Sequence, residues 1–138
     1  MPTRIMLRLT IADPVPGVLY SLQDPKSVPV EPRKAGEAPL SFYVPVSLSD
    51  DGRMTGPFVR REGPTRRFVY IGIGQGSGDH FTDISRRAKI DIHDIPGSLL
   101  DDARLGAILG VTLPGRAKDG GPACATVRPL NPWSVVSR

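Results

Sequence analysis

Apolar and polar residues alternate with a period of two near the start of the chain. Within residues 4–11, the side chains of Ile5, Leu7, Leu9 and Ile11 fall on one face, and arginine, methionine and threonine fall on the other. Side chains of a β-strand point alternately to opposite faces, so this pattern predicts a half-buried strand. The Asp-Pro-Val-Pro-Gly segment that follows ends it.

The longest alternating stripe lies in residues 40–48, which contain five apolar side chains at every second position. This segment predicts a second half-buried strand, with Phe42 deep in the core. Pro45 falls on the opposite face of the same strand. A proline lacks a backbone donor, so its presence indicates a sheet edge or a bulge at this point.

Shorter apolar runs predict further strands. Their ranges are 18–22, 57–61, 66–73, 88–95, 108–113, 123–128 and 133–136. The third of these runs is apolar on both faces, which is typical of a central strand. After Pro96-Gly97, Ser98 can cap a short helix over residues 99–105, with Asp101 in the capping-box position.

Proline and glycine set the connections between these elements. Residues 24–39 contain four prolines, which predicts a long, mobile surface loop. The glycine-rich residues 74–79 predict a loop between strands. The chain of 138 residues has 15 Gly and 15 Pro spread along its length, a distribution that suits short strands joined by turns.

These elements predict one domain over residues 1–138 of the all-β class. We expect an antiparallel β-sandwich or a partly closed barrel of about eight strands, with one short helix. The strands do not alternate with long helices, so a parallel sheet built from strand–helix–strand units is not expected.

The net charge of +4 is concentrated in one part of the chain. Between positions 60 and 89, basic residues outnumber acidic ones by seven to three, and the rest of the chain sums to zero. A local excess of this kind attracts anions, although a solvated surface is the commoner outcome. The candidate anion-binding residues are Arg60, Arg61, Arg66, Arg67, Arg86, Arg87 and Lys89.

Four of these arginines flank the turn of a predicted hairpin. A four-residue turn at 62–65 places Arg61 opposite Arg66 and Arg60 opposite Arg67. Like charges directly opposite on adjacent strands repel, so two such pairs are unfavourable for stability alone. The arrangement predicts a fork of guanidinium groups suited to phosphate or carboxylate.

No catalytic or metal-binding residue is predicted. The glycines at 72–78 match neither the dinucleotide fingerprint nor the P-loop, and no helix is expected after them. His80 and His93 each adjoin an aspartate, but their spacing matches no common ligand pattern, and solvated His–Asp pairs are expected. Cys124 has no evident activating partner and is expected to be a small packed residue. No cofactor is expected.

The compartment follows from three absences. A single cysteine permits no internal disulfide, the first residues lack a signal-peptide core, and no stretch approaches the roughly 18 apolar residues of a membrane span. We therefore expect a cytoplasmic protein that does not contact membranes.

Three segments resemble a family of small, uncharacterised bacterial proteins, classed as a domain of unknown function. The segments are Arg67-Phe68-Val69-Tyr70-Ile71, then Ser85-Arg86-Arg87-Ala88-Lys89-Ile90, then residues 118–127 with the sequence KDGGPACATV. The resemblance is best in the C-terminal half. It implies a stand-alone cytoplasmic bacterial protein and implies no activity, cofactor or site residue.

The leading functional expectation is a non-enzymatic binding or interaction domain with a basic face, whose partner is an anionic small molecule or an acidic surface. One alternative is an enzyme that acts on a small phosphate or carboxylate substrate, with the arginines stabilising charge. Another is a nucleic-acid-binding module. Aromatic residues make up only 6% of the chain, which disfavours base stacking.

Overall fold

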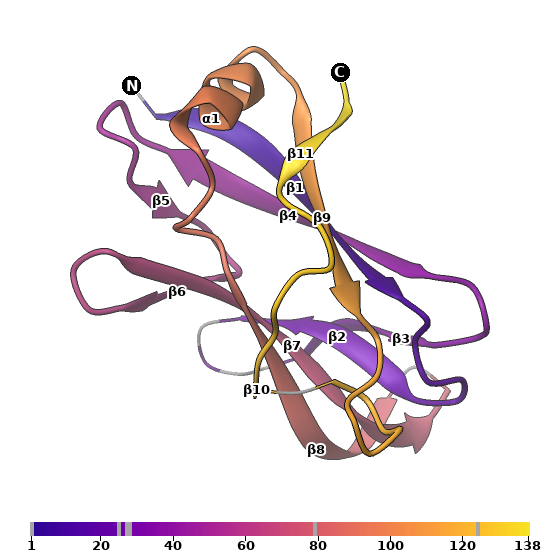
Figure 1. Ribbon diagram of the computed structural model, residues 1–138. Coiled ribbons are helices and arrows are strands. Elements are labelled where there is room, and N and C mark those ends of the chain that lie inside the picture. Colours follow the sequence, from indigo (N-terminus) through magenta and orange to yellow (C-terminus); the bar gives the residue numbers. More distant parts are fainter. Residues whose placement is uncertain (1, 25, 27–28, 79, 124) are drawn as a thin grey trace.

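A computed structural model of the chain describes residues 2–24, 26, 29–78, 80–123 and 125–138. Its strands form two sheets, called A and B (Figure 1). The order in sheet A is β11-β9-β1-β4-β5, and the order in sheet B is β10-β8-β7-β2-β3, with β6 beside β7. The prediction of an all-β fold with one short helix is confirmed, although the described residues contain eleven strands, more than predicted.

The strands of sheet A are β1 (Thr3–Ala12), β4 (Leu40–Leu48), β5 (Met54–Thr55), β9 (Ile108–Pro114) and β11 (Ser134–Ser137). The strands of sheet B are β2 (Leu19–Gln23), β3 (Pro29–Lys34), β6 (Val59–Glu62), β7 (Arg66–Ser77), β8 (His80–Asp91) and β10 (Ala125–Thr126). Most neighbours are antiparallel. The exceptions are β1 with β9 and β8 with β10, which pair in parallel.

The core lies between the inner faces of the two sheets. Sheet A contributes Ile5, Leu7, Leu9, Ile11, Leu40, Phe42, Val44, Val46, Leu48, Leu109, Val111 and Leu113. Sheet B contributes Tyr20, Leu22, Val69, Ile71, Ile73, Ala88 and Ile90. The alternation read from 4–11 and 40–48 is therefore the alternation between this core and the opposite, outer face of sheet A.

Pro45 lies where strand β4 loses its neighbour. Strand β5 pairs only with Ser47 and Leu48, so the β4 edge beyond them, including Pro45, has no partner strand on that side among the described residues. The proline therefore stands at a sheet edge, one of the two alternatives that its presence indicated.

The proline-rich segment is not a loop throughout. Residues Pro29–Lys34 form strand β3 at the edge of sheet B, paired with β2 and interrupted by a bulge. Glu31 has a φ of 52° within it. An edge strand needs backbone donors on one side only and tolerates bulges, which is why prolines fit here. The prediction of a loop over 24–39 was wrong for β3, and residues 25, 27 and 28 lie outside the described residues.

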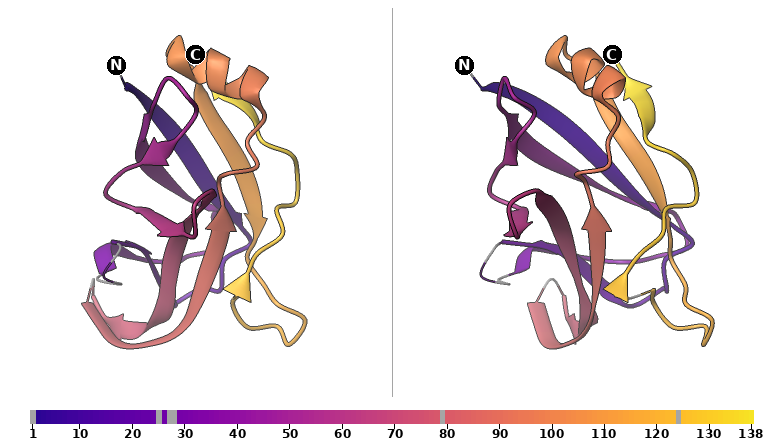
Figure 2. Two further views of the ribbon diagram at one scale, coloured as in Figure 1. Left: turned by 90° about the vertical axis from the view of Figure 1, so that its left-hand side faces the viewer. Right: turned by 60° about the vertical axis from the view of Figure 1, so that its left-hand side comes forward.

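The glycine-rich segment also belongs to a strand. Strand β7 continues to Ser77, and β8 begins at His80, so 74–77 are not a loop. The register of β7 against β8 shifts after Ile73 and again after Gln75. Bulges increase the local bend of a strand, and Figure 2 shows this long hairpin curling at the end of the molecule away from the helix.

Helix α1 (Gly97–Arg104) begins earlier than predicted and contacts β1, β9 and β11 at one end of sheet A (Figure 2). Its N-cap is Pro96, and no side chain caps it. The backbone N–H groups of Leu99 and Leu100 donate to Pro96 O at 3.0 and 3.1 Å. The predicted capping box of Ser98 and Asp101 is therefore not formed.

A substitution of Phe42 tests the core assignment. Phe42 is 6% exposed, whereas the next residue, Tyr43, is 52% exposed on the other face of the same strand. Phe42→Ala is expected to lower the free energy of unfolding by about 3–5 kcal/mol because it leaves a cavity between the sheets. Tyr43→Ala is the matched control and should cost much less. Equal losses in urea denaturation would contradict the assigned register.

A glycine substitution tests the curl of sheet B. A Cβ at Gly74 would lie 1.9 Å from the backbone oxygen of Asp83, so the two strands must separate to admit it. Gly74→Ala is expected to lower the free energy of unfolding by about 1–3 kcal/mol or more. Gly36→Ala is the control, because nothing lies within 4 Å of its Cβ. A Gly74→Ala protein as stable as this control would show that β7 and β8 are not so close.

Candidate functional site

The hairpin that carries four of the candidate arginines has a different register from the predicted one. Its turn has three residues, with Gly63 at a φ of 72°, and Glu62 lies opposite Arg66. Arg61 therefore lies opposite Arg67, and Arg60 lies opposite Phe68. The predicted pairs Arg61–Arg66 and Arg60–Arg67 were wrong by one residue, and no fork of four guanidinium groups forms.

This register divides the seven candidate residues between the two sides of sheet B. Directly paired residues share a face, and residues two apart on a strand also share it. The pairs Arg60–Phe68, Tyr70–Lys89 and Gly72–Arg87 place one set on the side away from the core. We call this set the basic outer face: Arg60, Arg66, Arg87 and Lys89.

Two aromatic rings lie beneath three of the four cations of the basic outer face. The Arg60 guanidinium carbon lies 4.3 Å from the centroid of the Tyr70 ring, and Lys89 Nζ lies 4.0 Å from that of Phe68. Arg66 approaches the Phe68 ring at 6.0 Å. Cation–π contacts of this kind restrict long side chains to a few conformations. These contacts could be predicted from the sequence only if the register of β6, β7 and β8 were already known.

Glu62 pairs with a cation of this face, and Asp91, opposite Phe68, lies on the same side of the sheet. Glu62 Oε2 lies 2.5 Å from Lys89 Nζ, and the Tyr70 hydroxyl donates to Glu62 Oε1 at 2.9 Å. The hydrogen bond from Lys89, followed by that from Tyr70, lowers the pKa of Glu62. The same contact with Glu62 raises the pKa of Lys89. Lys89 and Glu62 are thus held charged as an ion pair.

The remaining candidates are elsewhere. Arg61 donates from Nε to Gly63 O at 3.0 Å within the turn. Arg86 donates to Pro122 O at 2.7 Å and forms an ion pair with Asp119 at 3.1 Å, so it attaches the 116–123 segment to β8. These two arginines have structural partners and do not join the basic outer face.

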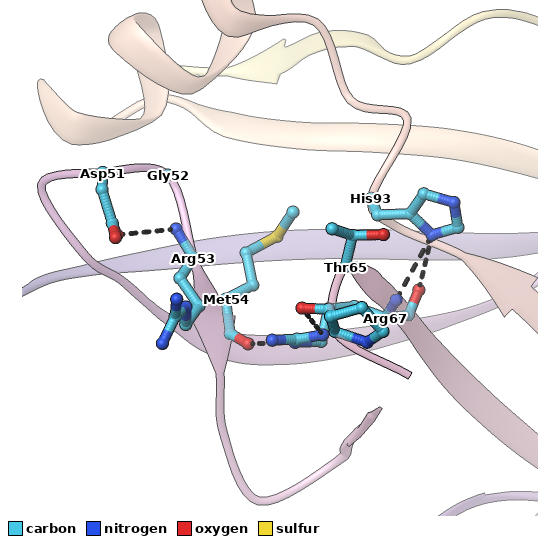
Figure 3. A pocket seen from close by; sticks show the side chains of 8 residues that line it. Asp51, Gly52, Arg53, Met54, Thr65, Arg67 and His93 are labelled. Atoms are coloured by element: carbon cyan, nitrogen blue, oxygen red, sulfur yellow. Dashed lines mark hydrogen bonds between the residues drawn. The ribbon is translucent and has the colours of Figure 1, made fainter. Parts of the chain in front are cut away.

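Arg67 is buried between the sheets and is only 5% exposed. Its side chain points inward, in line with the apolar residues of β7. Nε donates to the carbonyl oxygen of Met54 in sheet A at 3.1 Å (Figure 3). Nη1 donates to Arg66 O at 2.9 Å and to Pro64 O at 3.5 Å. The guanidinium therefore joins the two sheets through carbonyl groups.

A pocket of about 260 Å³ opens beside Arg67. It lies between the turn that precedes β5 and the turn of the β6–β7 hairpin (Figure 3). Its lining residues are Asp51, Gly52, Arg53, Met54, Pro64, Thr65, Arg67 and His93. Sequence reasoning identified only Arg67 as a binding residue here, because the others are brought in by turns of different strands.

His93 forms one wall of the pocket. Its Nδ1 lies 3.3 Å from the backbone N and from the backbone O of Arg67, and its ring packs edge-on to Phe68 with the centroids 5.6 Å apart. Strand β8 ends at Asp91, so His93 is half-buried behind the hairpin and does not point outward from a strand as predicted.

Two aspartates flank His93. Asp91 Oδ1 lies 2.5 Å from His93 Nδ1 and also accepts the backbone N–H of His93 at 2.9 Å. Asp94 Oδ1 lies 3.7 Å from Nε2. The ligand atoms of the three residues lie within 4.8 Å of one another, close enough for this cluster to hold a metal ion. Sequence spacing gave no indication of this grouping. Asp79, the neighbour of His80, and Cys124 lie outside the described residues.

The Asp91 carboxyl predicts a specific pH dependence. Burial raises the pKa of Asp91, and the hydrogen bond from the His93 backbone opposes the rise. The folded state then binds more protons than the unfolded state, whose pKa is about 3.9. As pH falls from the raised pKa of the folded state to the unfolded-state pKa of about 3.9, the wild type should therefore gain stability relative to Asp91→Asn. Urea denaturation between pH 7 and pH 4 measures this difference.

Asp119→Asn is the matched control for this experiment. Hydrogen bonds from Gly121 N–H and Arg86 lower the pKa of Asp119. The wild type should lose stability relative to this variant as pH falls from about 4 through the lowered pKa, which is the opposite sign, so this comparison extends the urea denaturation below pH 4. Two differences of the same sign would contradict the environment assigned to Asp91.

The fold defines a small all-β protein built from two facing sheets. The chain belongs to a family of unknown function (DUF5990), whose model matches residues 5–136. This match covers both sheets and the helix, which extends the resemblance read from the C-terminal half. No curated protein and no solved structure matches the chain. Among the described residues, no helix is long and apolar enough to cross a membrane.

Proposed function

We propose that this protein is a binding domain whose basic outer face docks on an acidic surface of a partner protein. The observation that carries the proposal is the gathering of four cations, Arg60, Arg66, Arg87 and Lys89, on a face with two carboxylates, Glu62 and Asp91. Arg66 and Arg87 are exposed, and within the described part of the chain neither forms an ion pair. Exposed cations of this kind steer an oppositely charged partner towards the surface.

The aromatic residues of this face favour a protein partner over single-stranded nucleic acid. Proteins that bind single strands stack bases on exposed rings. Phe68 is only 3% exposed, with Lys89 over its ring, and Arg60 lies over Tyr70. Bases would have to displace these cations before stacking. Carboxylates of an acidic protein surface need only reach the outer ends of the guanidinium groups.

Binding of labelled poly-glutamate tests the proposal. We expect saturable binding in fluorescence anisotropy that weakens as salt rises, because exposed ion pairs are screened. Arg66→Gln/Arg87→Gln should weaken the binding of poly-glutamate by about 2-fold to 30-fold. Each of the two exposed ion pairs that it removes contributes roughly 0.2–1 kcal/mol. Both side chains lie in water, so this variant should fold.

The matched control removes the same charge elsewhere. Arg4 and Lys118 are exposed and lie outside the basic outer face. Arg4→Gln/Lys118→Gln should leave the affinity for poly-glutamate unchanged. An equal loss in the two double variants would show a general charge effect and contradict the proposal. Tighter binding of a single-stranded oligonucleotide, lost in Arg66→Gln/Arg87→Gln, would instead indicate a nucleic-acid partner.

A further inference from the structure

The pocket beside Arg67 is separate from the basic outer face. Arg66 and Arg67 are consecutive residues of β7, and their side chains therefore point to opposite sides of sheet B. Arg66 projects to the outer face, whereas Arg67 reaches Met54 of sheet A and lines the pocket. A ligand in this pocket would contact none of the four cations of the outer face.

Arg67 has a charge that its own contacts do not neutralise. All its hydrogen-bond acceptors are backbone carbonyl oxygens, those of Met54, Arg66 and Pro64. Carbonyl groups satisfy N–H donors but bring no counter-charge. Among the described residues, no carboxylate lies within ion-pair distance of Arg67. A buried, unneutralised guanidinium is costly, and an anion placed against it would reduce that cost.

The unused donors of Arg67 limit what can bind. Nε and Nη1 are committed to carbonyl groups, so the two N–H groups of Nη2 are the ones without an acceptor in the described part of the chain. The bidentate contact through Nε and Nη2, which suits phosphate and carboxylate alike, is closed by Met54 O. The remaining nitrogen suits an anion that presents one or two oxygens end-on.

The other lining groups agree with a single negative charge. Arg53 is an exposed second cation at the rim, and Thr65 adds a hydroxyl donor. Asp51 also lines the pocket, and its carboxylate accepts from the Ser49 hydroxyl and from the Arg53 backbone. A carboxylate at the rim repels a dianion more strongly than a monoanion.

We propose that this pocket binds a small monocarboxylate. Its carboxylate would accept hydrogen bonds from Arg67 Nη2, with Thr65 and Arg53 at the pocket rim. The volume of about 260 Å³ equals the share of roughly eight or nine water molecules at about 30 Å³ each, which admits a carboxylate of a few carbons. The buried Met54 side chain gives an alkyl chain an apolar contact.

NMR titration of the full chain tests this site. Acetate, butyrate and inorganic phosphate are added separately, with sodium chloride holding the ionic strength constant. We expect saturable shifts of the Thr65 and Arg67 amides with acetate and butyrate, tighter binding of butyrate, and weak, non-saturating shifts with phosphate. Phosphate binding as tight as that of butyrate would overturn the ligand class. Absence of saturable shifts with either carboxylate would overturn the site.

Variants locate the binding. Arg53→Gln, at the exposed rim, should weaken butyrate binding by up to about fivefold, the upper end of what one exposed ion pair contributes. Arg66→Gln removes the same charge from the adjacent outer face and is the control, which should bind butyrate as the wild type does. Arg67→Met should abolish the saturable shifts. If Arg67→Met does not fold, the comparison of Arg53→Gln with Arg66→Gln decides, and equal affinities in those two would contradict the proposal.

Discussion

The structure depends on the contact between the apolar inner faces of its two sheets. Alternation in β1 and β4 supplies one face, and the residues Val69, Ile71 and Ile73 of β7 supply much of the other. Burial of this surface is the main favourable term in folding. One inward position of β7, Arg67, carries a charge, and that position lies where the apolar layer ends and a pocket opens between the sheets.

The two sites that we propose follow from the alternation along β7. Arg66 and Arg67 are adjacent in sequence, yet one joins a solvated row of cations and the other bonds to the backbone of sheet A. The outer face suits a large acidic partner, because its cations are spread over three strands. The pocket suits a small ligand, because it is a hollow of about 260 Å³ between two turns. One short segment thus takes part in two kinds of recognition that separate experiments distinguish.

Much of the fold is predictable from local pattern. The apolar positions of the period-two stripes at 4–11 and 40–48 are buried, because a half-buried strand is the regular structure that places all of them on one face. Strand β3 was missed because Pro29 and Pro32 disfavour regular pairing, and only its place at a sheet edge makes them acceptable. The glycine-rich end of β7 was missed because glycines there predict a loop. In the structure they are needed because the backbone of β8 lies too close to admit a Cβ.

The candidate site was predictable only in part. The concentration of charge between positions 60 and 89 identifies the residues of the basic outer face, but the turn length decides which of them meet. A turn one residue shorter than predicted replaced two arginine pairs with one. Apart from Arg67, the lining of the pocket could not be predicted from the sequence, because Arg53, Thr65 and His93 converge from separate turns. Convergence of this kind depends on how the two sheets face each other.

The most direct test of this account is the effect of Arg67 on stability. If its guanidinium joins the sheets through Met54, Arg67→Met removes the donor of one buried hydrogen bond, to Met54 O, and of the partly buried ones to Arg66 O and Pro64 O. The free energy of unfolding, measured by urea denaturation, should then fall by about 2 kcal/mol or more. Arg61→Met, on the exposed arginine opposite it, should change stability by less than about 0.5 kcal/mol. Equal stabilities of the two variants would contradict the central role assigned to Arg67.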